Sequence, residues 1–360
     1  MERVRVGIIG TSGWADLMYF NNLKGRPDVE LVGVSGRNPR TLAETAGRHG
    51  VAATYTDYRQ LIAEGGLDAV VIAAPDDQHL EMTLAAIDKG LHVLCEKPLA
   101  NNAGDARRML EAAGRRGVKH MVMFTWRWQP HNQFIKTMID EGTLGRVYRA
   151  QFSFIGGFAR DMVYQWRQDP ARANGVLGDL GSHMVDLMRW YFGEIASVSA
   201  DLGTSIPREG IAGHEAGSGN DSAHLALRLA SGARGIVDVS VVSAAADTLM
   251  RQIVHIEAEK ATVELEHTFF GERAGVSIRL LGTGGEPIQN LEVPAGYYGS
   301  SDPKNFLDIY GKEPAGPLAF IAALRENRQP DPGFDAGVKV QEVVDAALLS
   351  DRERRWVDLR

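Results

Sequence analysis

Residues 3–15 read "RVRVGIIGTSGWA", an apolar segment followed by a glycine-rich turn and the start of a helix. In such a turn, backbone N–H groups and the helix N-terminus point toward an anion such as a phosphate. Against the spacing G-x-G-x-x-G/A the stretch places Gly10, Ser12 and Ala15, so that Ser12 replaces the middle glycine beside Gly13. The turn alone also fits a tight strand-to-helix connection, and the segments around it favour a dinucleotide site.

Those surrounding segments alternate between strand and helix patterns. Apolar strand patterns occupy residues 3–10, 29–37, 67–75, 91–98 and 119–126. Helical patterns fill the intervals at 39–50, 57–65, 79–90 and 103–117. This alternation predicts an α/β domain, residues 1–124, with a doubly wound parallel sheet of the Rossmann type, covered on both faces by helices.

The remainder of the chain, residues 125–360, has a different pattern. Successive strand patterns lie at 146–155, 222–229, 235–242, 251–258, 261–266 and 275–282, and helices are expected at 178–193, 317–327 and 335–350. We expect an α+β domain with a large, mainly antiparallel sheet that is open on one face. Because exposed apolar sheet faces usually find partners, a homodimer or homotetramer is expected. The glycine-rich residues 208–221 predict a surface loop.

The composition is that of a globular protein, with 360 residues, 44% hydrophobic and 24% charged residues. The net charge of −7 gives no reason to expect a nucleic-acid partner, and the apolar runs are too short to span a membrane. The single cysteine excludes an internal disulfide and a cysteine-based zinc site, and no metal is expected. Because the chain begins directly with a strand pattern and no signal peptide, a cytoplasmic location is expected.

The end of the second strand bears on which dinucleotide would bind. An acidic residue at this tip bonds the ribose 2′-hydroxyl of NAD, whereas a basic residue suits the 2′-phosphate of NADP. Here the sequence is Ser35, Gly36, Arg37 and Asn38. Arg37 favours NADP over NAD, and its alternative role is that of a solvated loop arginine.

A second motif, "CEKPLA" at 95–100, follows the fourth of these strands. Ligands of open α/β sheets bind outside the carboxyl ends of the strands, where Lys97 can polarise a substrate hydroxyl. Pro98 restricts the backbone of Lys97 and can form a cis peptide bond. Glu96 is expected to contact either a ribose or the loop backbone. Taken alone, the tripeptide also fits a loop lysine before a proline.

The segment "GDLGSHMVDLMRWYFG", residues 178–193, predicts a largely apolar helix that nevertheless carries charge. Asp179, His183 and Asp186 share one face, because residues at i, i+4 and i+7 align on a helix. Buried carboxylates need partners or a polar cavity, and a substrate cavity would supply one. Alternatively, Asp179 caps the helix and His183 is a histidine satisfied within the core.

Together these motifs resemble the Gfo/Idh/MocA family, named for glucose–fructose oxidoreductase, inositol dehydrogenase and rhizopine catabolism proteins. The resemblance covers nearly the whole chain, through "GIIGTSGWA", the run from Asp68 to Ala100, "RWQP" (127–130), "GTLGRV" (142–147), "WR" (166–167) and "GDLGSHMVDLMRW". It implies a catalytic set of Lys97, Asp179 and His183. His183 would be the base, Asp179 would orient it or bind the hydroxyl, and Lys97 would stabilise a developing alkoxide.

The same resemblance suggests further contacts. Besides Gly10, Ser12, Gly13, Ala15, Arg37 and Asn38, the cofactor would contact Trp14, Ala74, Pro75, His79, Glu96, Lys97, Trp166 and Arg167. The substrate would contact Lys97, Arg127, Tyr164, Asp179 and His183. Asp186 would support the site rather than act in it.

The resemblance implies an NAD(P)-dependent oxidoreductase acting on a sugar, an inositol or a sugar derivative, with hydride passing between the nicotinamide and a secondary alcohol or ketone. Two alternatives stay open. One is a dinucleotide-binding sensor or co-regulator without turnover, which the intact Lys97, Asp179 and His183 set disfavours. The other is a redox-neutral enzyme that cleaves glycosides by transient oxidation.

Overall fold

The apolar segment at the start of the chain forms the central strand of a parallel sheet. The computed structural model describes residues 3–160, 166–206, 219–244, 250–284, 286–311 and 315–359. Its contacts divide the chain into two units, Met1–Phe124 with Leu307–Gln341, and Thr125–Phe306 with Glu342–Arg360. The sequence-based division at 124/125 assigned residues 307–341 to the second domain, whereas these contacts group them with the first unit.

The first unit contains a six-stranded parallel sheet in the order β3-β2-β1-β4-β5-β6. Its strands are β1 (Val4–Ile9), β2 (Val29–Ser35), β3 (Ala53–Tyr55), β4 (Ala69–Ile72), β5 (His92–Glu96) and β6 (His120–Met123). β1 and β4 are almost entirely buried, because helices cover both faces of the sheet. This order is that of the doubly wound Rossmann fold, as predicted.

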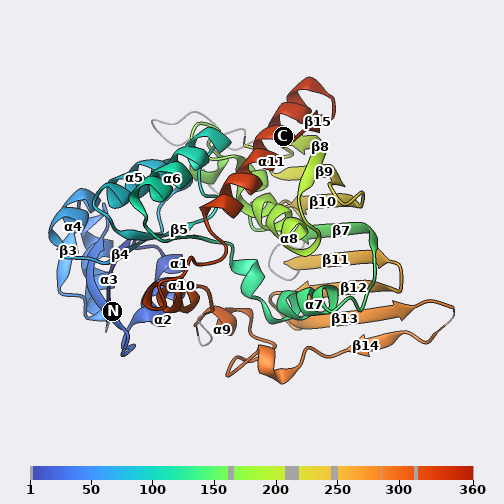
Figure 1. Cartoon of the computed structure of the whole chain (residues 1–360), viewed down its shortest axis with the longest axis horizontal. Coiled ribbons are helices and arrows are strands. Elements are labelled where there is room, and N and C mark those ends of the chain that lie inside the picture. Colours follow the sequence, from blue (N-terminus) through green and yellow to red (C-terminus); the bar gives the residue numbers. More distant parts are fainter. Residues whose placement is uncertain are drawn as a thin grey trace. The chain divides into compact units, whose positions relative to one another are not determined.

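The helices between the strands of this sheet follow the predicted alternation, and further helices of this unit come from residues beyond 305 (Figure 1). They are α1 (Gly13–Ala15), α2 (Asn21–Leu23), α3 (Pro39–His49), α4 (Tyr58–Glu64), α5 (His79–Asp88), α6 (Ala103–Arg116), α9 (Phe306–Gly311) and α10 (Ala315–Arg325), with α11 (Phe334–Glu353) beginning here. A π-helical turn, Asp16–Phe20, joins α1 to α2. α5 packs on β4 and β5, and α10 contacts β1 and α2.

The second unit is built on a nine-stranded sheet in the order β14-β13-β12-β11-β7-β10-β9-β8-β15. Its strands are β7 (Val147–Ile155), β8 (Ile195–Gly203), β9 (Ser222–Leu229), β10 (Arg234–Ser240), β11 (Arg251–Ala258), β12 (Ala261–Thr268), β13 (Gly275–Gly282), β14 (Gln289–Leu291) and β15 (Val357–Asp358). Apart from β7 and β10, the neighbouring strands are antiparallel, which confirms the predicted mainly antiparallel sheet.

Helix α8 (Ser182–Phe192) covers one face of this sheet by packing on β7 and β10 (Figure 1). Phe152 on β7 lies against Tyr191 and Phe192 of α8 at centroid distances of 5.8 and 6.1 Å. A second helix, α7 (Pro130–Asp140), starts just after the turn Thr125–Trp128.

Side chains on the opposite face of the sheet are half exposed and largely charged. Cross-strand ion pairs join Arg149 to Glu257 at 2.6 Å, Arg279 to Glu264 at 2.5 Å, and Arg251 to Glu266 at 3.3 Å. The expectation of an apolar open face is therefore wrong in its chemistry, because polar side chains alternate with the buried ones along each strand.

Several local expectations needed correction. The strand predicted to reach Trp126 ends at Met123, and Thr125–Trp128 forms a 3₁₀ turn instead. Strands β3, β8, β14 and β15 were not predicted. Most of the predicted loop 208–221 lies outside the described residues. Within the described ranges, no helix combines the length and apolarity that a membrane crossing requires.

Candidate active site

A cavity of about 880 Å³ opens in the first unit at the carboxyl ends of β1, β2 and β4. β1 and β4 are the neighbours at which the strand order reverses, and ligands of doubly wound sheets bind at this switch point. Six of the predicted cofactor residues line the cavity: Gly10, Ser12, Arg37, Asn38, Ala74 and Pro75.

The glycine-rich turn lets backbone approach a ligand closely. Gly10 adopts a φ of 132°, and a Cβ there would lie 2.3 Å from the carbonyl oxygen of Ala73, so only glycine fits. A Cβ on Gly13 would meet no described atom within 4 Å, which leaves open space beside the turn. Ser12 caps the first helix, because its hydroxyl accepts a hydrogen bond from the N–H of Ala15 at 3.1 Å. This backbone fits the pyrophosphate of a dinucleotide.

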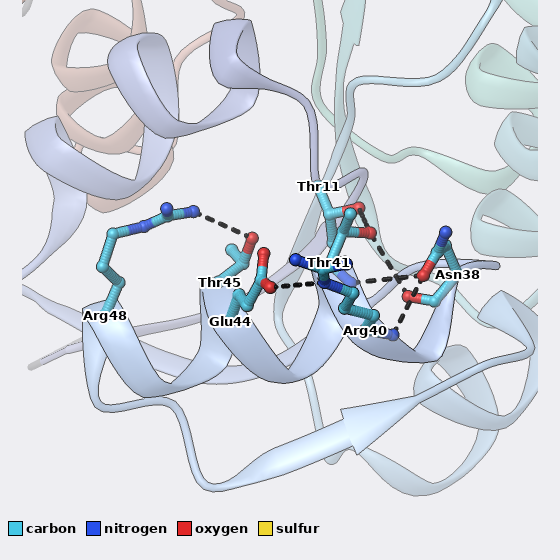
Figure 2. Close-up of polar contacts among 7 residues, drawn as sticks. All are labelled: Thr11, Asn38, Arg40, Thr41, Glu44, Thr45 and Arg48. Atoms are coloured by element: carbon cyan, nitrogen blue, oxygen red, sulfur yellow. Dashed lines mark hydrogen bonds and ion pairs between the residues drawn. The ribbon is translucent and has the colours of Figure 1, made fainter.

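The tip of β2 has no carboxylate and little room for one. A Cβ on Gly36 would lie 2.6 Å from the Cγ2 methyl group of Thr11. Figure 2 shows Thr11 beside the first turn of α3, where its hydroxyl is 3.2 Å from that of Thr41. Asn38 caps α3, since its side-chain oxygen accepts hydrogen bonds from the N–H groups of Arg40 at 2.9 Å and Thr41 at 3.3 Å. The backbone at this tip is therefore held by short polar contacts.

Glu96, at the end of β5, is buried and bonded within the protein. Its Oε1 atom accepts hydrogen bonds from Trp14 Nε1 at 2.6 Å and from the Tyr19 hydroxyl at 2.5 Å. Its Oε2 atom accepts a hydrogen bond from the N–H of Lys97 at 3.2 Å. Burial, and then the charge of Glu96, raise the pKa of Tyr19 well above its usual value. Glu96 thus ties the helical segment after the glycine-rich turn to the end of β5.

His79 holds the turn that carries Lys97 through contacts with backbone carbonyl groups. The Lys97–Pro98 peptide bond is cis, and the Lys97 side chain is half-buried. The ring nitrogens of His79 face the carbonyl oxygens of Pro98 at 2.8 Å and Ala74 at 3.0 Å, and the N–H of the neutral ring donates to one of them. Burial lowers the pKa of His79. Since His79 is fully buried, its effect on a ligand passes through this turn.

In the second unit, Asp179 and His183 lie on one continuous helical segment. The prediction of a regular helix from residue 178 was wrong in its first turn, since Leu177–Gly181 is π-helical and α8 begins at Ser182. A Cβ on Gly178 would lie 2.9 Å from the Cβ of Asn174, and one on Gly181 would lie 3.1 Å from Leu177 Cδ1, so glycine suits both positions. Such π-helical turns are frequent at functional sites. Asp179 is 21% exposed, and Arg167 Nε lies 3.5 Å from its carboxylate.

Asp179 and Arg167 line a cavity of about 160 Å³ in this unit, together with Gln168, Asn220 and Asp221. The guanidinium of Arg167 also lies over the ring of Trp166, 4.3 Å from its centroid. The structure thus brings three predicted residues, Trp166, Arg167 and Asp179, into one neighbourhood. The predicted substrate residue Tyr164 lies outside the described residues.

Arg127 forms a buried ion pair rather than a free cationic group. Its Nε and Nη2 atoms donate to the two carboxylate oxygens of Asp186, each at 2.7 Å. The two side chains are only 8% and 1% exposed. A contact between Arg127 and a substrate therefore stays a prediction, and the ion pair anchors the turn Thr125–Trp128 to α8.

Trp126 is the neighbour of the site that sequence patterns missed. Its indole stacks on the imidazole of His183, with centroids 4.7 Å apart and planes 6° apart. The strand pattern 119–126 predicts Trp126 at the end of a strand, whereas the structure places it in the turn Thr125–Trp128, directly before "RWQP". In the described part of the chain, no group of three or more His, Cys, Asp or Glu side chains is arranged to hold a metal ion.

The Rossmann strand order and the cavity at its switch point define a dinucleotide-binding protein. The family model for the NAD-binding Rossmann fold of the Gfo/Idh/MocA oxidoreductases matches residues 4–124, and the model for their C-terminal alpha/beta domain matches residues 136–359. The chain belongs to the Gfo/Idh/MocA family of oxidoreductases.

Named relatives extend over the full length. The chain is 28% identical over 399 residues to a levoglucosan dehydrogenase from Pseudarthrobacter phenanthrenivorans, covering 100% of this chain and 99% of that one. It is 27% identical over 369 residues to an inositol 2-dehydrogenase from Rhizobium meliloti, covering 99% of each. A structure of levoglucosan dehydrogenase in complex with NADH and levoglucosan is similar at a TM-score of 0.87, with 25% identity and 99% of both chains covered.

Proposed function

We propose that the protein is an NAD(P)-dependent dehydrogenase or reductase that acts on a secondary alcohol or ketone of a sugar, an inositol or a sugar derivative. The observation that carries the proposal is Asp179 and His183 on one helical segment, with Asp179 lining a cavity, in an oxidoreductase that also carries Lys97 after β5. Relatives named for levoglucosan and inositol support the substrate class.

Each residue has a role in alcohol oxidation. When bound, the nicotinamide supplies the acceptor for the hydride that leaves the carbinol carbon. His183 takes the hydroxyl proton at a ring nitrogen, a role that suits imidazole, whose ordinary pKa is ~6.5. Asp179 orients the imidazole or binds the hydroxyl, and the ammonium of Lys97 stabilises the developing alkoxide. In reduction, His183 returns the proton to the ketone oxygen.

We further propose that NADP(H) is preferred over NAD(H). The Thr11 methyl group crowds position 36, where a Cβ would lie 2.6 Å from it, and Gly36 carries no carboxylate to bond the ribose 2′-hydroxyl. Arg37 lines the cavity directly after this tip, and its planar guanidinium suits the 2′-phosphate of NADP. Gly10, Ser12, Asn38, Ala74 and Pro75 would line the remainder of the dinucleotide site.

We also propose a cytoplasmic homodimer or homotetramer. The cytoplasm holds the nicotinamide cofactor pool that such a reaction needs. The half-exposed face of the nine-stranded sheet carries both arginines and glutamates, as described above, and a mixed-sign face can pair with a second copy of itself.

Turnover assays test the proposed activity. Nicotinamide absorbance is followed with NADP⁺ and then NAD⁺ against levoglucosan, inositols, aldoses and sugar derivatives. We expect turnover by the native protein and a loss of about 100-fold or more in kcat for Lys97→Ala and His183→Ala. Cofactor binding without turnover on any substrate would instead indicate the sensor. Release of an aglycone without net cofactor reduction would indicate glycoside cleavage.

A further inference from the structure

The stacking of Trp126 on His183 is a contact between two buried rings of the second unit. Each residue is 4% exposed. The planes differ by 6° and the centroids lie 4.7 Å apart, so the indole covers one face of the imidazole. Stacked aromatic rings of this kind stabilise one another beyond the effect of the area they bury. The contact therefore favours one orientation of the His183 ring.

Trp126 is itself held from several sides. The rings of Phe154 and Phe269 lie 5.6 and 6.3 Å from it, between centroids. The side-chain amide of Asn132, in the first turn of α7, donates a hydrogen bond to the Trp126 carbonyl oxygen at 3.0 Å. Gln133 on the same helix donates to the carbonyl oxygen of Arg127. Both the ring and the backbone of Trp126 are thus fixed.

Residues close to Trp126 in the sequence, Arg127 and Asn132, contact α8 at two further positions along the helix. The buried ion pair of Arg127 with Asp186 lies one turn beyond His183. The hydroxyl of Tyr191, farther along the helix, donates to the carbonyl oxygen of Asn132 at 2.9 Å. Together with the stacking of Trp126 on His183, these contacts hold α8 against the turn Thr125–Trp128 and the first turn of α7. They place His183 opposite Trp126 in a single register.

We propose that Trp126 is a positioning residue for His183, an inference that rests on the proposed role of His183 as the base. Proton transfer requires the accepting nitrogen to point along the hydroxyl it serves. The indole face blocks the swing of the imidazole about its Cβ–Cγ bond and keeps that nitrogen aligned. Losing this constraint lowers the fraction of rings in the reactive orientation, since misplacement by about 1 Å can cost about 100-fold in rate.

Two substitutions separate positioning from bulk. Trp126→Leu removes the flat aromatic surface, whereas Trp126→Phe keeps a smaller one at the same place. We expect Trp126→Leu to lower kcat about 100-fold with KM for the alcohol nearly unchanged, and Trp126→Phe to restore most of kcat. Trp128→Leu, the same change two residues along the same turn, is the matched control and should keep the native kcat.

A spectroscopic readout stands apart from catalysis. In protein with isotope-labelled histidine, the indole should shift the His183 Cε1–H resonance upfield, and His183→Ala assigns that resonance by its disappearance. We expect the shift to be absent in Trp126→Leu while the other histidine resonances keep their positions. Those unmoved resonances show that the variant is folded.

The outcomes distinguish the two levels of inference. Native turnover that Trp126→Leu leaves unchanged overturns the positioning role alone. A loss in Trp126→Leu that Trp126→Phe does not restore also overturns it, because the tryptophan would then matter as bulk. Absence of turnover by the native protein overturns the proposed function, and the positioning role with it.

Discussion

At the scale of single residues, Gly36 and Arg37 separate two ways of recognising a dinucleotide. A Cβ at position 36 would lie 2.6 Å from the Thr11 methyl group. We therefore propose that selectivity between the two dinucleotides depends on the next position along the chain. The Arg37 side chain is exposed, so a substitution there tests its role without disturbing the core.

Arg37→Ser should raise KM for NADP⁺ about 10- to 100-fold and leave KM for NAD⁺ nearly unchanged, because only the 2′-phosphate loses a charged partner. Initial rates with each cofactor give both values. Arg40→Ser is the matched control, since Arg40 is 86% exposed and pairs with Glu44 at 2.9 Å (Figure 2). Equal effects of Arg37→Ser on both cofactors would contradict a 2′-phosphate contact.

Sequence patterns identified residues with chemical character but not the contacts between them. Lys97, Asp179 and His183 stood out because such side chains are unusual beside buried segments. The bonds from Trp14 and Tyr19 to Glu96 span 82 and 77 positions, and local periodicity carries no information about contacts at that separation. Trp126 was missed for a related reason, since an aromatic residue at the end of a predicted strand is usually part of the core.

At the scale of elements, strong hydrophobic periodicity was predictive and short or irregular elements were not. The five predicted parallel strands all formed, but β3, with three residues, was too short to give a pattern. β8 contains serines and an aspartate among its apolar residues, which weakens alternation. The π-helical turn before α8 depends on glycines packed against neighbours, which no 3.6-residue period reveals.

β6 begins at His120, whose contacts make stability depend on pH. His120 Nδ1 accepts a hydrogen bond from the N–H of Phe334 at 2.9 Å, and its ring stacks on Phe334 at 4.7 Å. Burial lowers the pKa of His120 to about 4. The unfolded chain therefore binds more protons between the unfolded pKa of ~6.5 and the folded value. The contribution of His120 is fully present above this window and is lost as pH falls through it.

His120→Asn keeps an acceptor near Phe334 but cannot titrate. We expect the native protein to lose stability on acidification from pH ~7 to ~4 by roughly 3 kcal/mol more than this variant. Urea unfolding at both pH values measures the difference. His224→Asn, at an exposed histidine on β9, should behave as the native protein does. Identical pH dependence in His120→Asn and the native protein would exclude this role.

At the scale of the whole molecule, the half-exposed face of the nine-stranded sheet bears on assembly. Ile253 on β11 lies on this face between Arg251 and His255, and it lines a cavity of about 330 Å³. A second copy turned by a two-fold axis would set each patch against its own counterpart.

Light scattering should give a mass of two or four times the 39.2 kDa chain. Ile253→Lys, which adds a charge at the centre of this face, should lower that mass by favouring dissociation. Thr262→Lys adds the same charge on the neighbouring strand β12, and comparing the masses of the two variants shows whether the effect depends on the position of the charge on the face. A native protein that is monomeric across the concentrations tested would rule out this assembly.

Because residues 307–341 belong to the first unit, that unit can complete its fold only after the second unit has been synthesised. Pro332 accepts a hydrogen bond from the N–H of Val122 at 3.0 Å, and Gln329 and Phe334 both contact His120. On a ribosome, the first 124 residues emerge long before these partners exist. Until the strands of the second unit have been translated, β6 therefore lacks these contacts. We expect an amino-terminal fragment ending at Phe124 to lack the same contacts, to expose part of β6 and to bind chaperones.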